Sequence, residues 1–143
     1  MRIVHPTTLA AAIILQSAAA VPMSEASFDG AYRGTLNCAK LSWTKAPLSN
    51  EPVSIAIMDG KVSYSRVLYG ADRTTVVGQE SGSGTVAPDG TIALTGGSAG
   101  RLGIMKATYK RKIENGAAIL NGAQWVTYQG KTEVRACTLH LML

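Results

Sequence analysis

Apolar and polar residues alternate along most of the chain after residue 28, in short segments separated by turn-forming residues. In the first segment, residues 31–38, Tyr32, Leu36 and Cys38 share one parity and polar residues take much of the other. Successive side chains of a strand point to opposite faces of a sheet, so this period of two predicts half-buried β-strands. The further predicted strands cover residues 53–58, 61–69, 74–79, 85–87, 91–95, 102–112 and 132–141.

Dipeptides that favour tight turns separate these strands. Asp59-Gly60 and Asn115-Gly116 are typical of two-residue hairpin turns. Asn121-Gly122 follows too closely to be another hairpin turn, and the apolar parity changes between Leu120 and Trp125. We therefore predict a β-bulge at Asn121-Gly122 that brings Leu120 and Trp125 to the same face.

Three segments are predicted to be loops. Residues 41–52 contain two prolines and no clear period. Residues 81–84 and 96–100 are rich in glycine and serine, but neither matches the phosphate-binding pattern G-x-x-x-x-G-K-[ST].

The spacing of the strands predicts the fold class. About eight strands at intervals of about 8–12 residues, joined by short hairpins, are typical of antiparallel barrels and sandwiches. The chain lacks the long crossovers that a parallel sheet requires. We predict an all-β protein, a small antiparallel up-and-down β-barrel of calycin- or avidin-like architecture, with a β-sandwich as the alternative.

The N-terminal region has the features of a signal peptide. Arg2 precedes a short apolar run from Leu9 to Leu15, and small residues follow it up to Ala20. The run is far shorter than the roughly 20 residues of a spanning helix. We predict a signal peptide over residues 1–20, with cleavage as late as Ala26, rather than an N-terminal helix of the fold. Residues 27–143 then form a single secreted or periplasmic domain, which is not a lipoprotein because no cysteine follows the apolar run.

The chain contains two cysteines, Cys38 and Cys137, which lie in the first and last predicted strands. Disulfides persist outside the cytoplasm, and two cysteines allow one intramolecular pairing. In an up-and-down barrel the first and last strands are neighbours, so the bond would close the seam. In a sandwich it would join the two sheets instead.

The residue inventory argues against catalysis. After the signal peptide the chain has one histidine, His140, and no G-x-S-x-G segment marks a nucleophilic serine for it. His140 and Cys137 have opposite parity, which makes them poor partners. No cluster of residues has the spacing of a zinc site. We therefore expect no enzymatic activity, no metal and no cofactor, and a hydrolase of low activity is only the third interpretation.

Two sets of residues are candidates for binding. Small barrels bind ligands in their mouths or interiors. The candidate lining residues are Tyr32, Tyr64, Met105, Tyr109, Trp125 and Tyr128. The candidate surface for an anionic partner, in a chain with a formal net charge of +5, consists of Lys106, Lys110, Arg111 and Lys112. With few aromatic residues to stack on bases, specific nucleic-acid binding is not expected.

The segment NGAAILNGAQWVTYQGKTEVRACTLHL, residues 115–141, resembles the last hairpin of avidin-type biotin-binding barrels, chiefly through Gln124-Trp125. The resemblance implies barrel architecture. The first strand, GAYRGTLNCAK, does not reproduce the polar network of the avidin-type site, so biotin binding is not implied.

The sequence thus predicts an exported, non-catalytic barrel that binds a small ligand or a protein partner. The alternative is a secreted or periplasmic inhibitor or interaction protein that acts through exposed loops, with Trp43 in the loop over residues 41–52 as its candidate contact.

Overall fold

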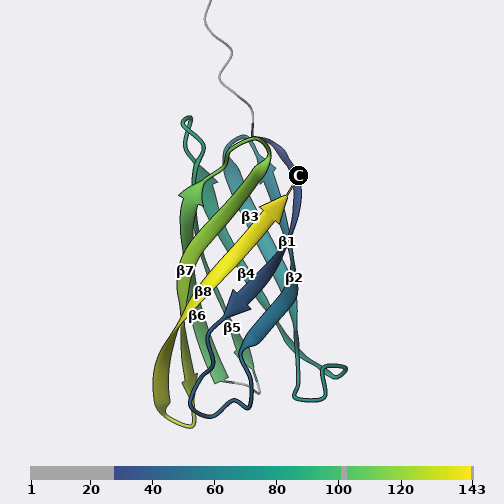
Figure 1. Ribbon diagram of the computed structural model, residues 1–143, viewed down its shortest axis with the longest axis vertical. Coiled ribbons are helices and arrows are strands. Elements are labelled where there is room, and N and C mark those ends of the chain that lie inside the picture. Colours follow the sequence, from purple (N-terminus) through teal and green to yellow (C-terminus); the bar gives the residue numbers. More distant parts are fainter. Residues whose placement is uncertain (1–27, 101–102, 143) are drawn as a thin grey trace, which may run out of the picture.

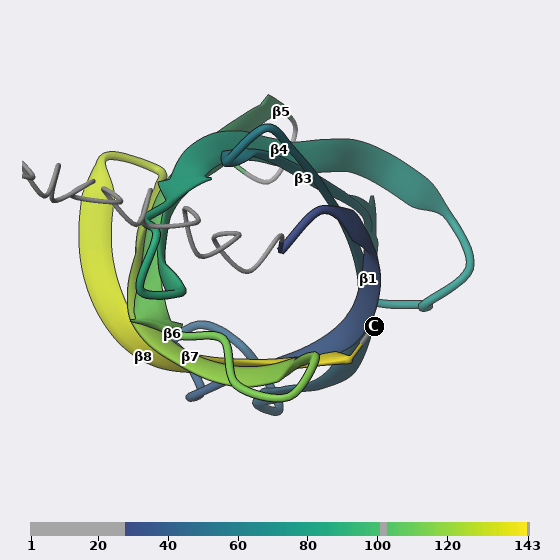
Figure 2. The same cartoon turned by 90° about the horizontal axis from the view of Figure 1, so that it is seen from above.

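Eight antiparallel strands, each paired with the next and the last with the first, form a closed barrel (Figures 1 and 2). The computed structural model describes residues 28–100 and 103–142. The strands are β1 (Gly30–Cys38), β2 (Leu48–Met58), β3 (Lys61–Tyr69), β4 (Val76–Val86), β5 (Thr91–Gly100), β6 (Gly103–Lys112), β7 (Ala117–Tyr128) and β8 (Lys131–Met142). The predicted up-and-down barrel is confirmed, and the sandwich is not formed.

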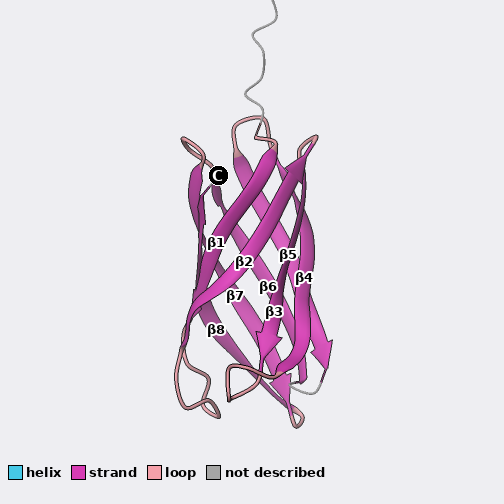
Figure 3. Ribbon diagram, turned by 90° about the vertical axis from the view of Figure 1, so that its right-hand side faces the viewer, coloured by secondary structure: helices cyan, strands magenta, loops and turns pink. Residues whose placement is uncertain are grey.

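The ribbon in Figure 3 shows only strands and their connections in the coloured part of the chain. Within residues 28–100 and 103–142 there is no helix long and apolar enough to cross a membrane. The predicted signal peptide lies outside the described residues.

The seam between β1 and β8 is closed by hydrogen bonding and by a covalent bond. The two strands pair from Arg33 opposite Met142 to Cys38 opposite Cys137, and the two cysteines form a disulfide. The predicted pairing is confirmed, as is the orientation of Cys137, which is buried on the same face as Leu139 and Leu141.

The barrel interior differs along its axis. We call the end that carries the β1–β2 loop and the β7–β8 turn, at the bottom of Figure 1, the lower end. Toward the upper end the inward residues are almost all aliphatic. They include Ile57, Val62, Val86, Ile92, Leu94, Leu120 and Leu141. Toward the lower end, buried charged and polar residues lie among the apolar ones.

The glycine-rich segments are strands, so the prediction that they form loops was wrong. Gly82 lies within β4 and pairs with Gly96 of β5. A β-carbon at either position would collide with the side chain of Tyr64, which fills the space above both. The glycines therefore make room for an aromatic residue inside a narrow barrel. In the sequence, such glycines resemble those of a loop.

The predicted bulge at Asn121-Gly122 is also absent. The register of β7 and β8 runs without a break from Ala117 opposite Met142 to Tyr128 opposite Lys131. Leu120 is followed on the inner face by Gly122 and Gln124, which leaves Trp125 on the outer face with 38% of its surface exposed. The apparent change of parity arose because the inward position near Trp125 is occupied by a polar residue.

The predicted loop over residues 41–52 is shorter than expected. β2 begins at Leu48 and includes Pro52. The ladder between β2 and β3 extends only from Met58 to Ser54, so Pro52 lies beyond it and needs no amide hydrogen on that side.

Candidate functional site

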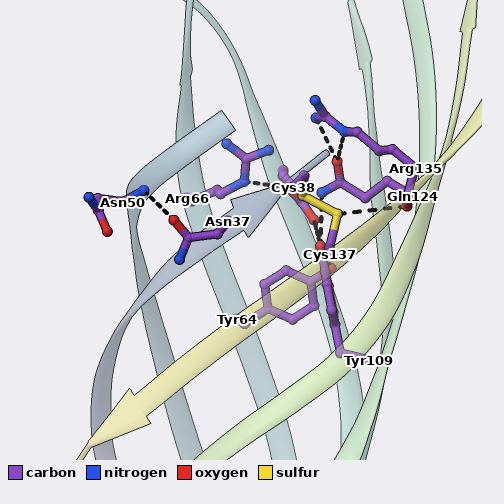
Figure 4. Close-up of a disulfide and its surroundings, with 10 residues drawn as sticks. Asn37, Cys38, Asn50, Tyr64, Arg66, Tyr109, Gln124, Arg135 and Cys137 are labelled. Atoms are coloured by element: carbon purple, nitrogen blue, oxygen red, sulfur yellow. Dashed lines mark hydrogen bonds and ion pairs between the residues drawn. A yellow bond between two sulfur atoms is a disulfide. The ribbon is translucent and has the colours of Figure 1, made fainter. Parts of the chain in front are cut away.

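Six polar side chains from five strands meet inside the lower half of the barrel. We call them the polar belt. Its members are Tyr64 and Arg66 of β3, Glu80 of β4, Tyr109 of β6, Gln124 of β7 and Arg135 of β8. Figure 4 shows this region beside the disulfide. Each member occupies the inward parity of its strand, so the barrel closure brings them together.

Glu80 is the centre of one half of the belt. Its carboxylate is completely buried and accepts a hydrogen bond from Arg66 Nε at 2.5 Å. The other carboxylate oxygen accepts from the hydroxyl of Tyr64 at 3.1 Å and from that of Tyr109 at 3.4 Å. Buried charges are tolerated when they are paired and hydrogen-bonded, and Glu80 and Arg66 meet that condition with each other.

The two tyrosines act as donors in this arrangement. Burial, and then the negative charge of Glu80, raises the pKa of the Tyr64 hydroxyl well above its usual value. The same two causes raise the pKa of Tyr109. Both hydroxyls therefore stay protonated at physiological pH, and the two rings pack edge to face with centroids 6.2 Å apart.

Gln124 connects this half of the belt to Arg135. Its Nε2 donates to the hydroxyl of Tyr109 at 2.8 Å. Its Oε1 accepts from Arg135 Nε at 3.0 Å and from Arg135 Nη2 at 2.7 Å. Gln124 is completely buried, and its two groups are matched to a hydroxyl on one side and a guanidinium on the other.

Arg135 has no carboxylate partner among the described residues. The ion pairs of that part of the chain are Arg66–Glu80, Arg73–Glu51 and Lys131–Glu133. Among the described residues, the Arg135 side chain hydrogen-bonds only to the neutral amide oxygen of Gln124. Burial, and then the positive charge of Arg66, lowers the pKa of the Arg135 guanidinium, although arginine remains charged in proteins. The lower end of the barrel thus carries a partly buried positive charge that forms no ion pair with an acidic group of residues 28–100 or 103–142.

The rim beside Arg135 is held in place by polar and aromatic contacts. The backbone N–H and the hydroxyl of Ser42 donate to the Glu133 carboxylate, which also pairs with Lys131 at 2.7 Å. Trp43 packs against Tyr128 at 6.2 Å between ring centroids, and Lys131 Nζ lies 5.6 Å from the centre of the Trp43 ring. These contacts attach the β1–β2 loop to the β7–β8 hairpin.

The same contacts affect the acidity of Glu133. Hydrogen bonds from Lys131 first, and then from Ser42, lower the pKa of Glu133 to about 2. The carboxylate is therefore ionised over the whole physiological range and is fully engaged with its own partners.

The wall of the barrel is open between β2 and β3. The two strands separate below the pair Ser54–Ser65. A pocket of about 230 Å³ lies there, and Arg66 is one of its lining residues. The Arg66 side chain is only 3% exposed, so this pocket meets the polar belt at that one residue and lies otherwise on the outer surface.

A larger depression, of about 670 Å³, lies on the outer surface near His140, Arg111 and Met142. None of its polar lining side chains is buried. An exposed surface of this kind lacks the convergent, desolvated polar groups that characterise ligand sites, so the polar belt is the stronger candidate.

Four of the predicted lining residues are inside the barrel. Tyr64, Met105 and Tyr109 are buried in the lower half, and Tyr64 and Tyr109 belong to the belt. Tyr32 is buried near the opposite end, where its hydroxyl donates to the backbone oxygen of Phe28.

The other two predicted lining residues are not in the interior. Trp125 lies on the outer face, and Tyr128 is 37% exposed at the lower rim. The prediction that they line the interior was wrong. Trp125 faces outward because the predicted bulge in β7 does not form, whereas Tyr128 shares the inward parity of Gln124 but is the last residue of the strand, at the rim.

The predicted basic residues are exposed. Lys106, Lys110 and Lys112 share the outer face of β6, whereas Arg111 has the opposite parity and lies near the upper end. Tyr109 belongs to the interior and is not part of this surface.

His140 is exposed on the outer face, opposite Thr35 and Ile119. Cys137 is buried on the inner face, so the two side chains point away from each other. In the described part of the chain, no group of three or more His, Cys, Asp or Glu side chains could hold a metal ion.

Sequence reasoning overlooked the charged and amide members of the belt. Arg66 has the parity of Val62 and Tyr64, and Arg135 has that of Cys137 and Leu139. A charged residue at the inward parity of a strand is the signal that could have identified them.

Comparison of the chain with protein-family models, curated proteins and solved structures finds no match. The site has to be interpreted from its own chemistry.

Proposed function

We propose that the protein is an exported, non-catalytic binding module that holds a small ligand at the lower, polar end of its barrel. The observation that carries the proposal is the partly buried guanidinium of Arg135, which hydrogen-bonds to a neutral group and to no carboxylate of the described residues. A partly buried charge without an ion-pair partner costs folding free energy, so its presence favours a use in binding.

The absence of catalysis is proposed from the chemistry of the belt. Its single carboxylate, Glu80, is buried and engaged by three donors, one of them the charged Arg66. The hydroxyls of Tyr64 and Tyr109 are held protonated. Neither hydroxyl is poised to exchange a proton near neutral pH.

Native mass spectrometry of protein purified from its own host tests the proposal. We expect a bound species of defined mass that is released on denaturation, and a higher Tm for the loaded than for the stripped protein. Trp125 lies on the outer face and is a poor reporter of a ligand in the barrel, whereas Trp43 lies at the lower rim. A protein that carries nothing and whose Tm no small molecule raises would contradict the proposal.

The second candidate is recognition of a protein partner by the β1–β2 loop. It is favoured by the attachment of Ser42 and Trp43 to the β7–β8 hairpin, since a fixed loop loses little entropy on binding. In that case Trp43→Ala abolishes partner binding with the barrel intact. The ligand-binding proposal expects Trp43→Ala to leave the bound species in place.

A further inference from the structure

We infer that the ligand carries a carboxylate, and that the free end of the Arg135 guanidinium binds it. The inference rests on the proposed function and names the chemical class of its ligand. It follows from the geometry of the donors and from the charge balance of the belt.

The donor geometry leaves one edge of Arg135 available. A guanidinium has five N–H donors in a fixed plane. Arg135 uses Nε and Nη2, its side-on edge, to contact the single oxygen Gln124 Oε1. The end-on edge, formed by Nη1 and the second hydrogen of Nη2, has no partner among the described residues. Two parallel N–H groups at this edge match the two oxygens of a carboxylate.

Gln124 fixes the direction of that edge. Its side chain is completely buried, and its amide nitrogen is held by the Tyr109 hydroxyl at 2.8 Å. Tyr109 in turn contacts Glu80. The chain of contacts orients the guanidinium before any ligand arrives, and such preorganisation lowers the entropic cost of binding.

The charge balance indicates a single negative charge on the ligand. Arg66 is neutralised by Glu80, and the rim carboxylate Glu133 by Lys131. Arg135 leaves one excess positive charge. A carboxylate supplies one negative charge, whereas a phosphate monoester carries about −1.5 to −2 near neutral pH.

The test uses benzoate and benzamide, two probes of almost the same shape that differ in charge, together with inorganic phosphate. Calorimetry on the full mature protein is expected to show benzoate binding at least about tenfold more tightly than benzamide, as charge-assisted hydrogen bonds require. Benzoate should also bind more tightly than phosphate. Raising the salt concentration from about 0.01 M to about 1 M should lower the affinity for benzoate and leave the affinity for benzamide unchanged.

The matched variants are Arg135→Gln and Arg33→Gln. Both remove one guanidinium, but Arg33 is exposed on the outer face of β1. We expect Arg135→Gln to lower the affinity for benzoate by about tenfold or more and to leave the affinity for benzamide unchanged. Arg33→Gln should bind both probes as the wild type does. Arg135→Lys keeps the charge without the planar fork and should be intermediate. If circular dichroism shows that Arg135→Gln does not fold, Arg135→Lys takes its place in the comparison.

Different failures have different meanings. Equal binding of benzoate and benzamide, or unchanged benzoate binding in folded Arg135→Gln, overturns the carboxylate inference and leaves the binding module intact. Phosphate binding more tightly than benzoate overturns the choice of carboxylate. If no probe binds and protein from the host carries no ligand, both the inference and the proposed function fail.

Discussion

At the scale of single residues, Glu80 shows how a charge is accommodated in the core. It has no exposed surface, and its two oxygens accept from Arg66, Tyr64 and Tyr109. The pair with Arg66 is a poor source of net stability, because desolvation offsets most of the attraction. Removing one partner is far more damaging than removing both.

This reasoning predicts the behaviour of substitutions in the pair. Glu80→Leu leaves Arg66 buried without a counter-charge and should cost about 3–5 kcal/mol of unfolding free energy. The double variant Glu80→Leu with Arg66→Met should cost clearly less, since no unpaired charge remains. Urea denaturation of the single and double variants measures both. A double variant less stable than Glu80→Leu alone would show that the unpaired charge of Arg66 is not the cause of the loss.

Glu133 predicts a dependence of stability on pH. Its pKa is lowered from 4.5 to about 2 by Lys131 and Ser42, so its contribution is complete above about pH 4.5 and is lost as the pH falls toward 2. The Tm of Glu133→Gln should therefore lie below that of wild type at neutral pH, and the two should converge in acid. Thermal melts from neutral pH to about pH 2 check this, and a constant difference across the range would argue against it.

At the scale of elements, the inner faces of β4 and β5 are shaped to receive the Tyr64 ring. Gly82 and Gly96 oppose each other below it, and a side chain at either position would meet both the ring and the neighbouring backbone. A barrel of eight strands has an interior just wide enough for side chains to fill. The large Tyr64 side chain of β3 therefore requires glycine at the positions of β4 and β5 against which its ring packs.

The prediction at this scale compares two glycines of β4. Gly82→Ala should destabilise the protein by about 1–3 kcal/mol, as expected for overpacking. Gly78→Ala is the control, because a β-carbon there meets only Leu68 Cδ1 at 3.7 Å, an ordinary contact. Chemical denaturation should separate the two variants. Equal stabilities would show that the ring of Tyr64 moves aside without cost.

At the scale of the whole molecule, the disulfide joins the first and last strands of the barrel. Cys38 and Cys137 are 99 residues apart and lie opposite each other on β1 and β8. The crosslink restricts the unfolded chain over nearly the whole domain. Such a restriction is worth more when the loop that it closes is long.

Replacing both cysteines by alanine should lower the free energy of unfolding by about 4–5 kcal/mol on the chain-entropy account. This is a large part of the about 5–15 kcal/mol that stabilises a typical domain. Denaturation of the double variant, with reduced wild type as a second comparison, measures the effect. The control is Ala39→Ser, an exposed neighbour of Cys38. A loss well under 1 kcal/mol would indicate that the seam holds without the bond.

The sequence alone was sufficient for the class of fold, the approximate number of strands and the disulfide. Alternation of apolar and polar residues has the period of a strand, and turn residues such as Asp59-Gly60 act through local backbone preferences. Two cysteines allow one pairing. Each of these signals depends on neighbours along the chain or on simple counting.

Only the tertiary structure decided which polar residues are inside. Gln124 and Arg135 pair across β7 and β8, but Glu80 and Arg66 reach them only because the barrel is closed. The same closure explains why Gly82 and Gly96 belong to strands and why Trp125 faces outward. Burial of a charged group depends on partners from distant strands, and no local pattern encodes those contacts. For that reason the polar belt, and with it the candidate ligand site, emerged from the fold.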